Sequence, residues 1–231
     1  FASSACWISA NSYQIYSKFL PFTIKNFIMV RNVQQLFDLT GQVALVTGGS
    51  RGLGLQLAHA LGEAGARIML SSRKADDLEN ACAELQDAGI DARWVAADCA
   101  QESEINRLAD ETLQRMGDVD ILVNNAGATW GAPAEDHPLE AWDKVMNLNV
   151  RGYFLLSQVI AKRSMIGRRS GRIINLSSIQ GLGGNPDGQN TIAYNTSKGA
   201  VLSFTEALAA EWGKYNITVN AICPGFFHSK M

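Results

Sequence analysis

A chain of 231 residues is long enough to bury one sizeable core, so its length predicts a single domain. Hydrophobic residues make up 47% of the chain and charged residues 18%, and it has 21 glycines, a composition that excludes a disordered protein. The net charge of -2 gives no concentrated basic surface, so we expect no nucleic-acid partner.

The first 28 residues differ in composition from the rest of the chain. They contain no acidic residue, and Ser, Asn, Gln and Lys interrupt their apolar runs, so they match neither a membrane span nor a signal peptide. A Ser-rich, acid-free segment is compatible with a transit peptide, although no arginine precedes Arg31. We expect residues 1–28 to be an extension outside the fold, with the boundary near residue 35 and the domain at 36–231, and no membrane association.

From Gln42 onward, short apolar runs alternate with segments of helical periodicity. Strands are predicted at residues 42–47, 67–72, 92–97, 120–127, 171–178 and 217–225, and helices at 55–66, 74–89, 103–117, 142–167 and 193–215. Strands that alternate with helices predict a parallel sheet covered on both faces by right-handed crossovers. The expected fold class is therefore α/β, a doubly wound Rossmann-type parallel sheet in a single domain.

A glycine-rich turn joins the first predicted strand to the first helix. Thr47, Gly48, Gly52 and Gly54 lie in the sequence TGGSRGLG. Glycines at this position let the backbone approach a pyrophosphate, and the helix N-terminus offers free N–H donors. The position of the turn in a repeating βαβ chain predicts nucleotide binding.

The end of the second predicted strand bears on the choice of cofactor. A carboxylate there would accept the ribose hydroxyls of NAD, but this chain has Ser72 followed by Arg73, and Arg51 lies within reach in the glycine turn. Guanidinium groups suit a 2′-phosphate, which favours NADP(H). The alternative is that both arginines are ordinary solvated surface residues.

The cysteines and histidines form no recognisable site. Cys6, Cys82, Cys99 and Cys223 include no CxxC pair, so we expect free thiols and a cytoplasmic protein. The three histidines are scattered without metal-ligand spacing, and we expect no metal.

Six motifs in order give the chain a family resemblance. They are TGGSRGLG, NNAG (124–127), NLNVRG with Asn149, NLSS with Ser178, YNTSK with Tyr194 and Lys198, and the Pro224–Gly225 pair. In order and nearly in spacing, residues 36–231 resemble the short-chain dehydrogenase/reductase family, most closely its bacterial gluconate dehydrogenases and 3-oxoacyl carrier-protein reductases.

The resemblance implies a proton-transfer site. Tyr194 would be the general acid or base, Lys198 would lower its pKa and hold the nicotinamide ribose, Ser178 would polarise the carbonyl, and Asn149 would help connect Lys198 to solvent. The chemistry is consistent with these roles, because a tyrosine pKa of about 10 is too high for ready deprotonation and a nearby ammonium lowers it. Tyr194 and Lys198 are four residues apart, on one helix face. The alternative is a core tyrosine beside a lysine that extends to water.

The resemblance also implies a cofactor site. Asp98 would contact the adenine, Asn125 to Gly127 the adenosine ribose, the Pro224 turn the nicotinamide and Ser229 its carboxamide. The full expected set is Thr47, Gly48, Ser50, Arg51, Gly52, Leu53, Gly54, Ser72, Arg73, Asp98, Cys99, Asn125, Ala126, Gly127, Tyr194, Lys198, Pro224, Gly225 and Ser229.

Two features depart from the family pattern. The Ser178 to Tyr194 interval is a few residues longer than usual, with the addition in residues 183–190, GGNPDGQN. This addition either reshapes the substrate pocket or is a tolerated surface insertion. The family usually continues past the equivalent of Met231 with a substrate-covering segment, another helix and a seventh strand, so we expect a fragment lacking the last strand, or else a dependence on a partner.

The expected function is hydride transfer between NADP(H) and a carbonyl or secondary alcohol, with a keto-sugar acid or a 3-oxoacyl compound as substrate. The alternative is a regulatory or inactive member that binds NADP(H) without turnover. Arg163, near Arg168 and Arg169, stands where the resemblance to carrier-protein reductases implies contact with an acidic carrier. A second basic position of those reductases is Tyr215 in this chain. The alternative is that these arginines are solvated residues at a helix end. Family analogy predicts a homodimer or homotetramer.

Overall fold

The computed structural model describes residues 32–185 and 188–227. Contacts divide the chain into two units, 1–38 and 39–231, which are described separately. The described part of the first unit is helix α2 (Val33–Phe37), where the Asn32 side chain accepts a hydrogen bond from the Gln35 backbone and the Gln35 side chain accepts one from Asn32 N. The predicted extension, residues 1–28, lies outside the described residues.

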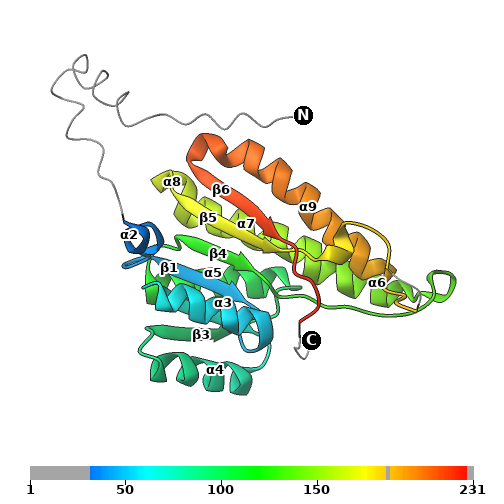
Figure 1. The fold of residues 1–231 in the computed structure, drawn as a ribbon, viewed down its shortest axis with the longest axis horizontal. Coiled ribbons are helices and arrows are strands. Elements are labelled where there is room, and N and C mark those ends of the chain that lie inside the picture. Colours follow the sequence, from blue (N-terminus) through cyan, green and yellow to red (C-terminus); the bar gives the residue numbers. More distant parts are fainter. Residues whose placement is uncertain (1–31, 186–187, 228–231) are drawn as a thin grey trace, which may run out of the picture. The chain divides into compact units, whose positions relative to one another are not determined.

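Six parallel strands form one sheet in the second unit, in the order β3-β2-β1-β4-β5-β6 (Figure 1). The strands are β1 (Val43–Thr47), β2 (Arg67–Ser72), β3 (Ala92–Ala96), β4 (Ile121–Asn124), β5 (Gly171–Leu176) and β6 (Ile217–Ile222). This order is that of a doubly wound Rossmann-type sheet. The predicted fold class is confirmed, and each predicted strand is present with its ends trimmed by up to three residues.

Helices connect successive strands as the periodicity predicts. They are α3 (Gly52–Glu63), α4 (Ala75–Asp87), α5 (Glu102–Met116), α6 (Leu139–Met146), α7 (Gly152–Ile160), α8 (Ile166–Arg168) and α9 (Ile192–Trp212). Two π-helical turns, η2 (Asn147–Arg151) and η3 (Ala161–Met165), join α6, α7 and α8 into one helical run. That run corresponds to the helix predicted at 142–167, and periodicity did not indicate its π turns.

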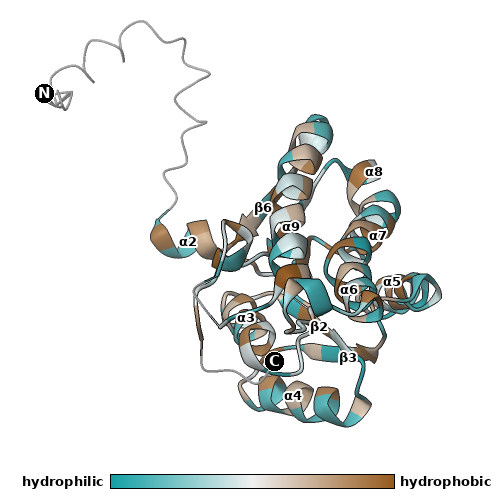
Figure 2. Cartoon of the chain, turned by 90° about the vertical axis from the view of Figure 1, so that its right-hand side faces the viewer, coloured by the Kyte–Doolittle hydropathy of each residue, from teal (hydrophilic) through white to brown (hydrophobic). Residues whose placement is uncertain are grey.

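The core has two halves, one on each face of the sheet. In β1, Val43 and Leu45 pack with buried residues of α5, α7 and α9, whereas Ala44 and Val46 pack with those of α3 and α4. Successive strand residues point to opposite faces, so a strand covered on both faces is apolar throughout. Figure 2 shows the complementary pattern in the helices, which carry both hydrophobic and hydrophilic residues.

The sheet order reverses between β1 and β4, because β2 and β3 follow β1 on one side while β5 and β6 lie beyond β4. In an open α/β sheet, ligands bind in the crevice beyond the carboxyl ends of the strands at such a reversal. The fold therefore places the glycine turn after β1 and the residues after β4 and β5 beside one crevice. Within the described ranges, no helix combines the length and apolar character needed to cross a bilayer.

Candidate active site

The glycine turn is shaped by close backbone packing. A Cβ atom on Gly54 would lie 2.2 Å from the Gly48 carbonyl oxygen and 2.5 Å from the Asn125 amide nitrogen, so only glycine fits there. The N-cap of α3 is Arg51, whose side chain makes no capping hydrogen bond, and the first turn contains no acidic residue. The first N–H groups of α3 therefore remain available to an anion.

The Thr47 side chain links the end of β1 to the end of β4. Its hydroxyl donates to the Val123 carbonyl at 3.2 Å and accepts from the backbone N–H groups of Asn125 and Ala126 at 3.0 and 3.1 Å. The Asn125 side chain in turn donates to the carbonyls of Thr47 and Gly48. Thr47, predicted from the sequence to bind cofactor, is buried and supports the turn from outside the cavity lining.

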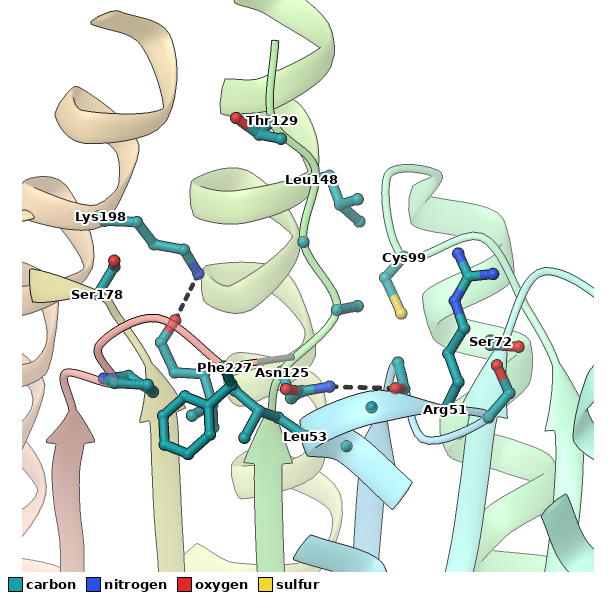
Figure 3. A pocket seen from close by; sticks show the side chains of 18 of the residues that line it. Arg51, Leu53, Ser72, Cys99, Asn125, Thr129, Leu148, Ser178, Lys198 and Phe227 are labelled. Carbon is teal, nitrogen blue, oxygen red and sulfur yellow. Dashed lines mark hydrogen bonds between the residues drawn. The ribbon is translucent and has the colours of Figure 1, made fainter. Parts of the chain in front are cut away.

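A cavity of about 490 Å³ lies at the carboxyl ends of the strands. This volume is within the usual range for small-molecule sites. In Figure 3, Arg51 and Ser72 lie at one end, Lys198 and Ser178 at the other, and Asn125 between them. Most of the predicted site residues line it: Gly48, Ser50, Arg51, Gly52, Leu53, Gly54, Ser72, Arg73, Asp98, Cys99, Asn125, Ala126, Gly127, Ser178, Tyr194, Lys198, Pro224 and Gly225. Ser229 lies outside the described residues.

The end of the cavity beside β2 suits a nucleotide. The Ser72 hydroxyl is buried and has no hydrogen-bond partner in the described part of the chain. Exposed Arg51 and Arg73 line the same region, as does Lys74, and none of the three makes an ion pair with a described residue. An orphaned hydroxyl beside unpaired cations fits a phosphorylated ribose, although the Asp77 carboxylate also lines this end.

Asp98 and Cys99 form the wall that follows β3. One Asp98 carboxylate oxygen accepts the Ala100 backbone N–H at 3.0 Å, which fixes the side chain at the start of the loop. Burial raises the pKa of the Cys99 thiol to about 12, with a smaller contribution from the Asp98 charge. The thiol therefore stays protonated and serves as a small apolar wall.

Lys198 occupies the opposite end and is almost completely buried. Its ammonium donates to the Leu176 carbonyl at 2.5 Å and lies 5.6 Å from the centre of the Tyr194 ring. Burial lowers the pKa of Lys198 to about 8, opposed by a smaller contribution from Cys223. Lys198 is thus a lysine able to change charge near neutral pH.

The expectation that the ammonium lowers the pKa of Tyr194 is not met in this structure. Burial raises the pKa of Tyr194, and an interaction with the Ser178 hydroxyl opposes the rise. Desolvation of the phenolate is the larger of these two effects. Tyr194 is therefore a protonated phenol at neutral pH, with an O–H group that can donate a hydrogen bond.

Asn149 lies behind the cavity, fully buried in the π-helical turn η2. Its side-chain oxygen accepts the Ala128 N–H at 2.8 Å, and its amide donates to the Ala128 carbonyl and to the Ser197 hydroxyl, both at 2.9 Å. It therefore ties the segment after β4 to α9 directly beside Lys198. Such π turns are frequent at functional sites.

A short 3-10 turn after β5, η4 (Ile179–Gly181), sets the position of Ser178 relative to α9. A Cβ on Gly181 would lie 2.6 Å from the Lys198 carbonyl carbon, so glycine permits the turn to touch the helix backbone. The Ser177 hydroxyl donates to the Lys198 carbonyl at 2.7 Å and strengthens this contact. The turn thus holds Ser178 and Lys198 beside one another.

Other lining residues were not identified from the sequence. They are Lys74, Asp77, Ala97, Thr129, Leu148, Leu176, Ser177, Ile179, Gln180, Phe226 and Phe227. Several of them directly follow residues that the motifs identified, so their position just after a strand could have indicated that they line the cavity. Leu148 does not follow a strand, because it lies in the π-helical turn η2.

The six-stranded sheet is of Rossmann type, and the cavity at its switch point is lined by the glycine turn at one end and by Ser178, Tyr194 and Lys198 at the other. The family model of the short chain dehydrogenases matches residues 42–231. The chain belongs to this family of oxidoreductases.

Three similar proteins indicate the range of the family around this chain. A rhamnolipids biosynthesis 3-oxoacyl-(acyl-carrier-protein) reductase from Pseudomonas aeruginosa is 39% identical, over 84% of this chain and 76% of the relative. A solved gluconate 5-dehydrogenase from Burkholderia cenocepacia, in complex with NADP and tartrate, is 36% identical with a TM-score of 0.80, covering 85% and 76%. A solved NAD+-bound xylitol dehydrogenase is 38% identical with a TM-score of 0.77, covering 81% and 71%.

Proposed function

We propose that the protein is an NADP(H)-dependent oxidoreductase that interconverts a ketone and a secondary alcohol, with Tyr194 as general acid and base. The observation that carries this proposal is the convergence of Ser178, Tyr194 and Lys198 at one end of a cavity whose other end is the glycine turn. A nucleotide held along this cavity would present its reactive ring beside the three side chains.

The chain's own residues account for the proton. NADPH, when bound, supplies the hydride that reduces the carbonyl carbon. The Tyr194 phenol donates its proton to the carbonyl oxygen, and the Ser178 hydroxyl orients that oxygen. Lys198, in its protonated form, would support the negative charge that develops on Tyr194 as the proton leaves.

The choice of NADP(H) over NAD(H) rests on the end of β2. Ser72 stands where a carboxylate would accept two ribose hydroxyls, and Arg51, Arg73 and Lys74 surround it. The net positive charge of this region suits a 2′-phosphate, even after the Asp77 carboxylate is counted. The solved gluconate 5-dehydrogenase with NADP supports this preference, whereas the NAD+-bound xylitol dehydrogenase shows that similar chains differ in cofactor.

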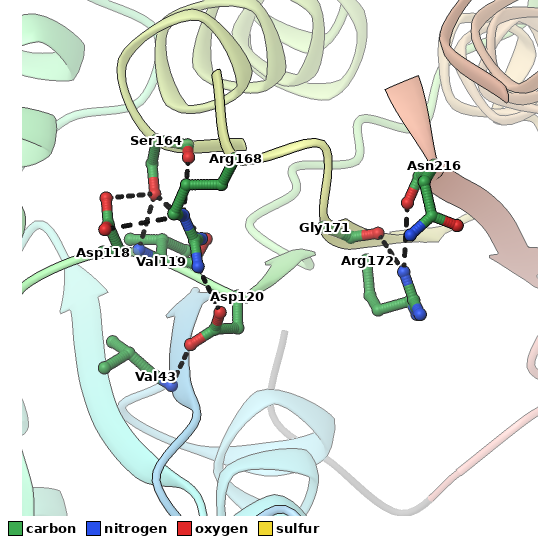
Figure 4. Close-up of polar contacts among 9 residues, drawn as sticks. All are labelled: Val43, Asp118, Val119, Asp120, Ser164, Arg168, Gly171, Arg172 and Asn216. Carbon is green, nitrogen blue, oxygen red and sulfur yellow. Dashed lines mark hydrogen bonds and ion pairs between the residues drawn. The ribbon is translucent and has the colours of Figure 1, made fainter. Parts of the chain in front are cut away.

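The arginines considered for an acidic carrier protein have partners within the chain. Arg163 binds the Asp110 carboxylate at 2.7 Å and the Asn106 side-chain oxygen at 2.6 Å. Figure 4 shows Arg168 bonded to Asp120 and to neighbouring groups. An acidic carrier would have to displace these contacts, which favours a small substrate, a keto-sugar acid, over a carrier-bound 3-oxoacyl chain.

Replacing Tyr194 with phenylalanine tests the proposal. Loss of the phenol should lower kcat by about 10²- to 10⁴-fold, the usual contribution of a positioned acid, and leave NADPH affinity nearly unchanged. Turnover would be followed as NADPH absorbance loss with keto-sugar acids and acetoacetyl thioesters, and affinity by calorimetry. Tyr215→Phe, a half-buried tyrosine on η5 (Gly213–Tyr215), is the matched control.

Two results would count against the proposal in different ways. Equal turnover by Tyr194→Phe and wild type would remove Tyr194 from the proton transfer. Tight NADPH binding by the wild type, without oxidation of NADPH by any of the carbonyl compounds, would indicate a nucleotide-binding protein that does not turn over.

A further inference from the structure

The loop between η4 and α9 is built from interlocking polar side chains. The Asn185 amide donates to the Thr191 hydroxyl at 2.7 Å, to the Gln189 carbonyl at 2.9 Å and to the Asn195 side-chain oxygen at 3.1 Å. Asn195 returns a hydrogen bond to the Asn185 side-chain oxygen at 3.0 Å and donates to the Gly183 carbonyl. Asn195 follows Tyr194 directly, so this network fastens the loop to the helix turn that carries the proposed acid.

The same loop is also joined to the segment after β4. The Ala132 backbone N–H donates to the Asn190 carbonyl at 2.8 Å, so the loop bridges two of the segments that surround the cavity. A merely tolerated insertion would need neither this bridge nor the asparagine network. The bonds therefore favour the first of the two interpretations of residues 183–190, a loop that shapes the pocket.

Gln180 connects this loop to the reaction centre. Its backbone N–H donates to the Ser178 hydroxyl oxygen at 3.2 Å, and its side chain lines the cavity. Its side-chain amide donates to the Gln189 side-chain oxygen at 3.0 Å. Gln180 thus stands next to the group that orients the carbonyl and is steadied by the loop.

The pairing leaves one acceptor of Gln180 unused. The Gln180 side-chain oxygen has no further partner among the described residues, whereas Gln189 is exposed and does not line the cavity. A free acceptor matches the O–H of a substrate hydroxyl group, whereas an alkyl chain offers no donor. Polar groups left unpaired against an apolar chain lose their hydration without compensation.

From this arrangement we propose that the Gln180 side chain, held in place by Gln189, recognises a hydroxyl near the substrate carbonyl, so that the enzyme selects polyhydroxylated ketones over 3-oxoacyl chains. This inference rests on the proposed function. A site built to hydrogen-bond a hydroxyl discriminates against analogues that lack it. Gln180, in the turn after Ser178, is therefore a specificity-determining residue, and Gln189 of the lengthened loop is the residue that positions it.

Steady-state kinetics with two ketones test this inference, namely 5-keto-D-gluconate and an acetoacetyl thioester, both at saturating NADPH. The wild type should show the higher kcat/KM with the keto-gluconate. Gln180→Leu should lower that value about 2- to 10-fold, the range expected for the loss of one ordinary hydrogen bond at a half-buried position. The same variant should leave kcat/KM for the thioester equal or higher, and NADPH affinity unchanged.

A double-mutant cycle separates recognition from a structural effect. If the two amides act as one unit, Gln180→Leu combined with Gln189→Leu should cost about as much as Gln180→Leu alone. Gln56→Leu, on the exposed face of α3, is the matched control and should change neither substrate's kinetics. Thermal unfolding of each variant confirms that the proteins compared are folded.

The outcomes distinguish this inference from the proposed function. An equal loss with both ketones in Gln180→Leu, or a wild type that prefers the thioester, would overturn the specificity inference while the oxidoreductase function stands. A wild type that reduces neither these two ketones nor any other carbonyl compound, though it binds NADPH, would overturn both.

Discussion

Lys198 is a cation buried without a carboxylate among the described residues. Its ammonium donates a hydrogen bond to the Leu176 carbonyl, and the rings of Tyr153 and Tyr194 lie near it. A carbonyl and two ring faces compensate only part of the hydration that a buried ammonium loses. Its pKa of about 8, below the ordinary 10.5, reflects this loss.

The lowered pKa makes a prediction about stability. Between pH 8 and 10 the unfolded chain binds a proton at Lys198 that the folded protein has mostly released, so the free energy of unfolding gains a contribution that rises with pH. The unfolding free energy of the wild type minus that of Lys198→Met should rise by about 2 kcal/mol over this range. Denaturant titrations at both pH values measure it, and a difference independent of pH would contradict the lowered pKa.

The sequence predicted that the residues whose side chains the proposed proton transfer requires lie close together. Tyr194, Lys198 and Ser178 meet at one end of the cavity, as their motifs indicate. The net direction of the Tyr194 pKa depends on burial in three dimensions, which the spacing of Tyr194 and Lys198 in the sequence does not predict. Gln180 was missed because a glutamine in a turn has no pattern that marks it as a lining residue.

At the scale of elements, the turn between β1 and α3 depends on how closely two backbones approach. The carbonyl of Gly48 and the amide of Asn125 occupy the space where a Gly54 side chain would project. The sequence motif predicts a glycine here for phosphate approach, and the structure adds a packing reason within the protein itself.

Gly54→Ala should therefore disrupt the turn. A methyl group 2.2 Å from a backbone oxygen must push the turn and the start of α3 apart, and we expect a loss of about 1–3 kcal/mol in stability with NADPH affinity lowered at least tenfold. Gly167→Ala is the matched control, since its added methyl meets nothing within 4 Å in a helix and should be neutral or slightly stabilising. Unfolding curves and calorimetry measure both effects, and a fully stable Gly54→Ala with normal affinity would contradict the packing argument.

Hydrophobic periodicity alone did not predict the π turns in the helical run from α6 to α8. Its pattern predicts a single long helix, whereas in the structure two π turns interrupt the run. The first of these turns holds Asn149 in position to bond both the Ala128 backbone and Ser197. The predicted role of Asn149 stays a prediction, but its position beside Lys198 depends on this tertiary contact.

At the scale of the whole molecule, a buried chain of polar groups links the sheet to the helices on one face. The Asn124 amide of β4 donates to Ser157 of α7 at 3.0 Å and to the Asn175 side-chain oxygen of β5 at 2.8 Å, and Asn175 donates to Thr205 of α9 at 2.9 Å. Buried polar groups of this kind fix one arrangement of the packed layers, since any shift leaves them unpaired.

Breaking this chain at its centre should destabilise the domain. Asn175→Ala leaves the Asn124 amide and the Thr205 hydroxyl each without one partner. We expect the free energy of unfolding to fall by about 2–4 kcal/mol, because one to two buried groups lose a hydrogen bond and a small cavity forms. Asn220→Ala, at an exposed position of β6, is the matched control and should cost under about 0.5 kcal/mol. Chemical denaturation compares the two, and similar small losses would show that the polar chain contributes little.

The sequence by itself determined the fold class, the strand-helix alternation and most of the residues that line the cavity, because periodicity and motifs are local properties of the chain. Only the tertiary structure decided that Thr47 supports the turn from outside the cavity lining, that Arg163 is paired with Asp110, and that Gln180 meets Gln189 beside Ser178. These facts depend on contacts between segments distant in sequence and on burial. These long-range contacts and this burial form only when helices pack on the two faces of the sheet.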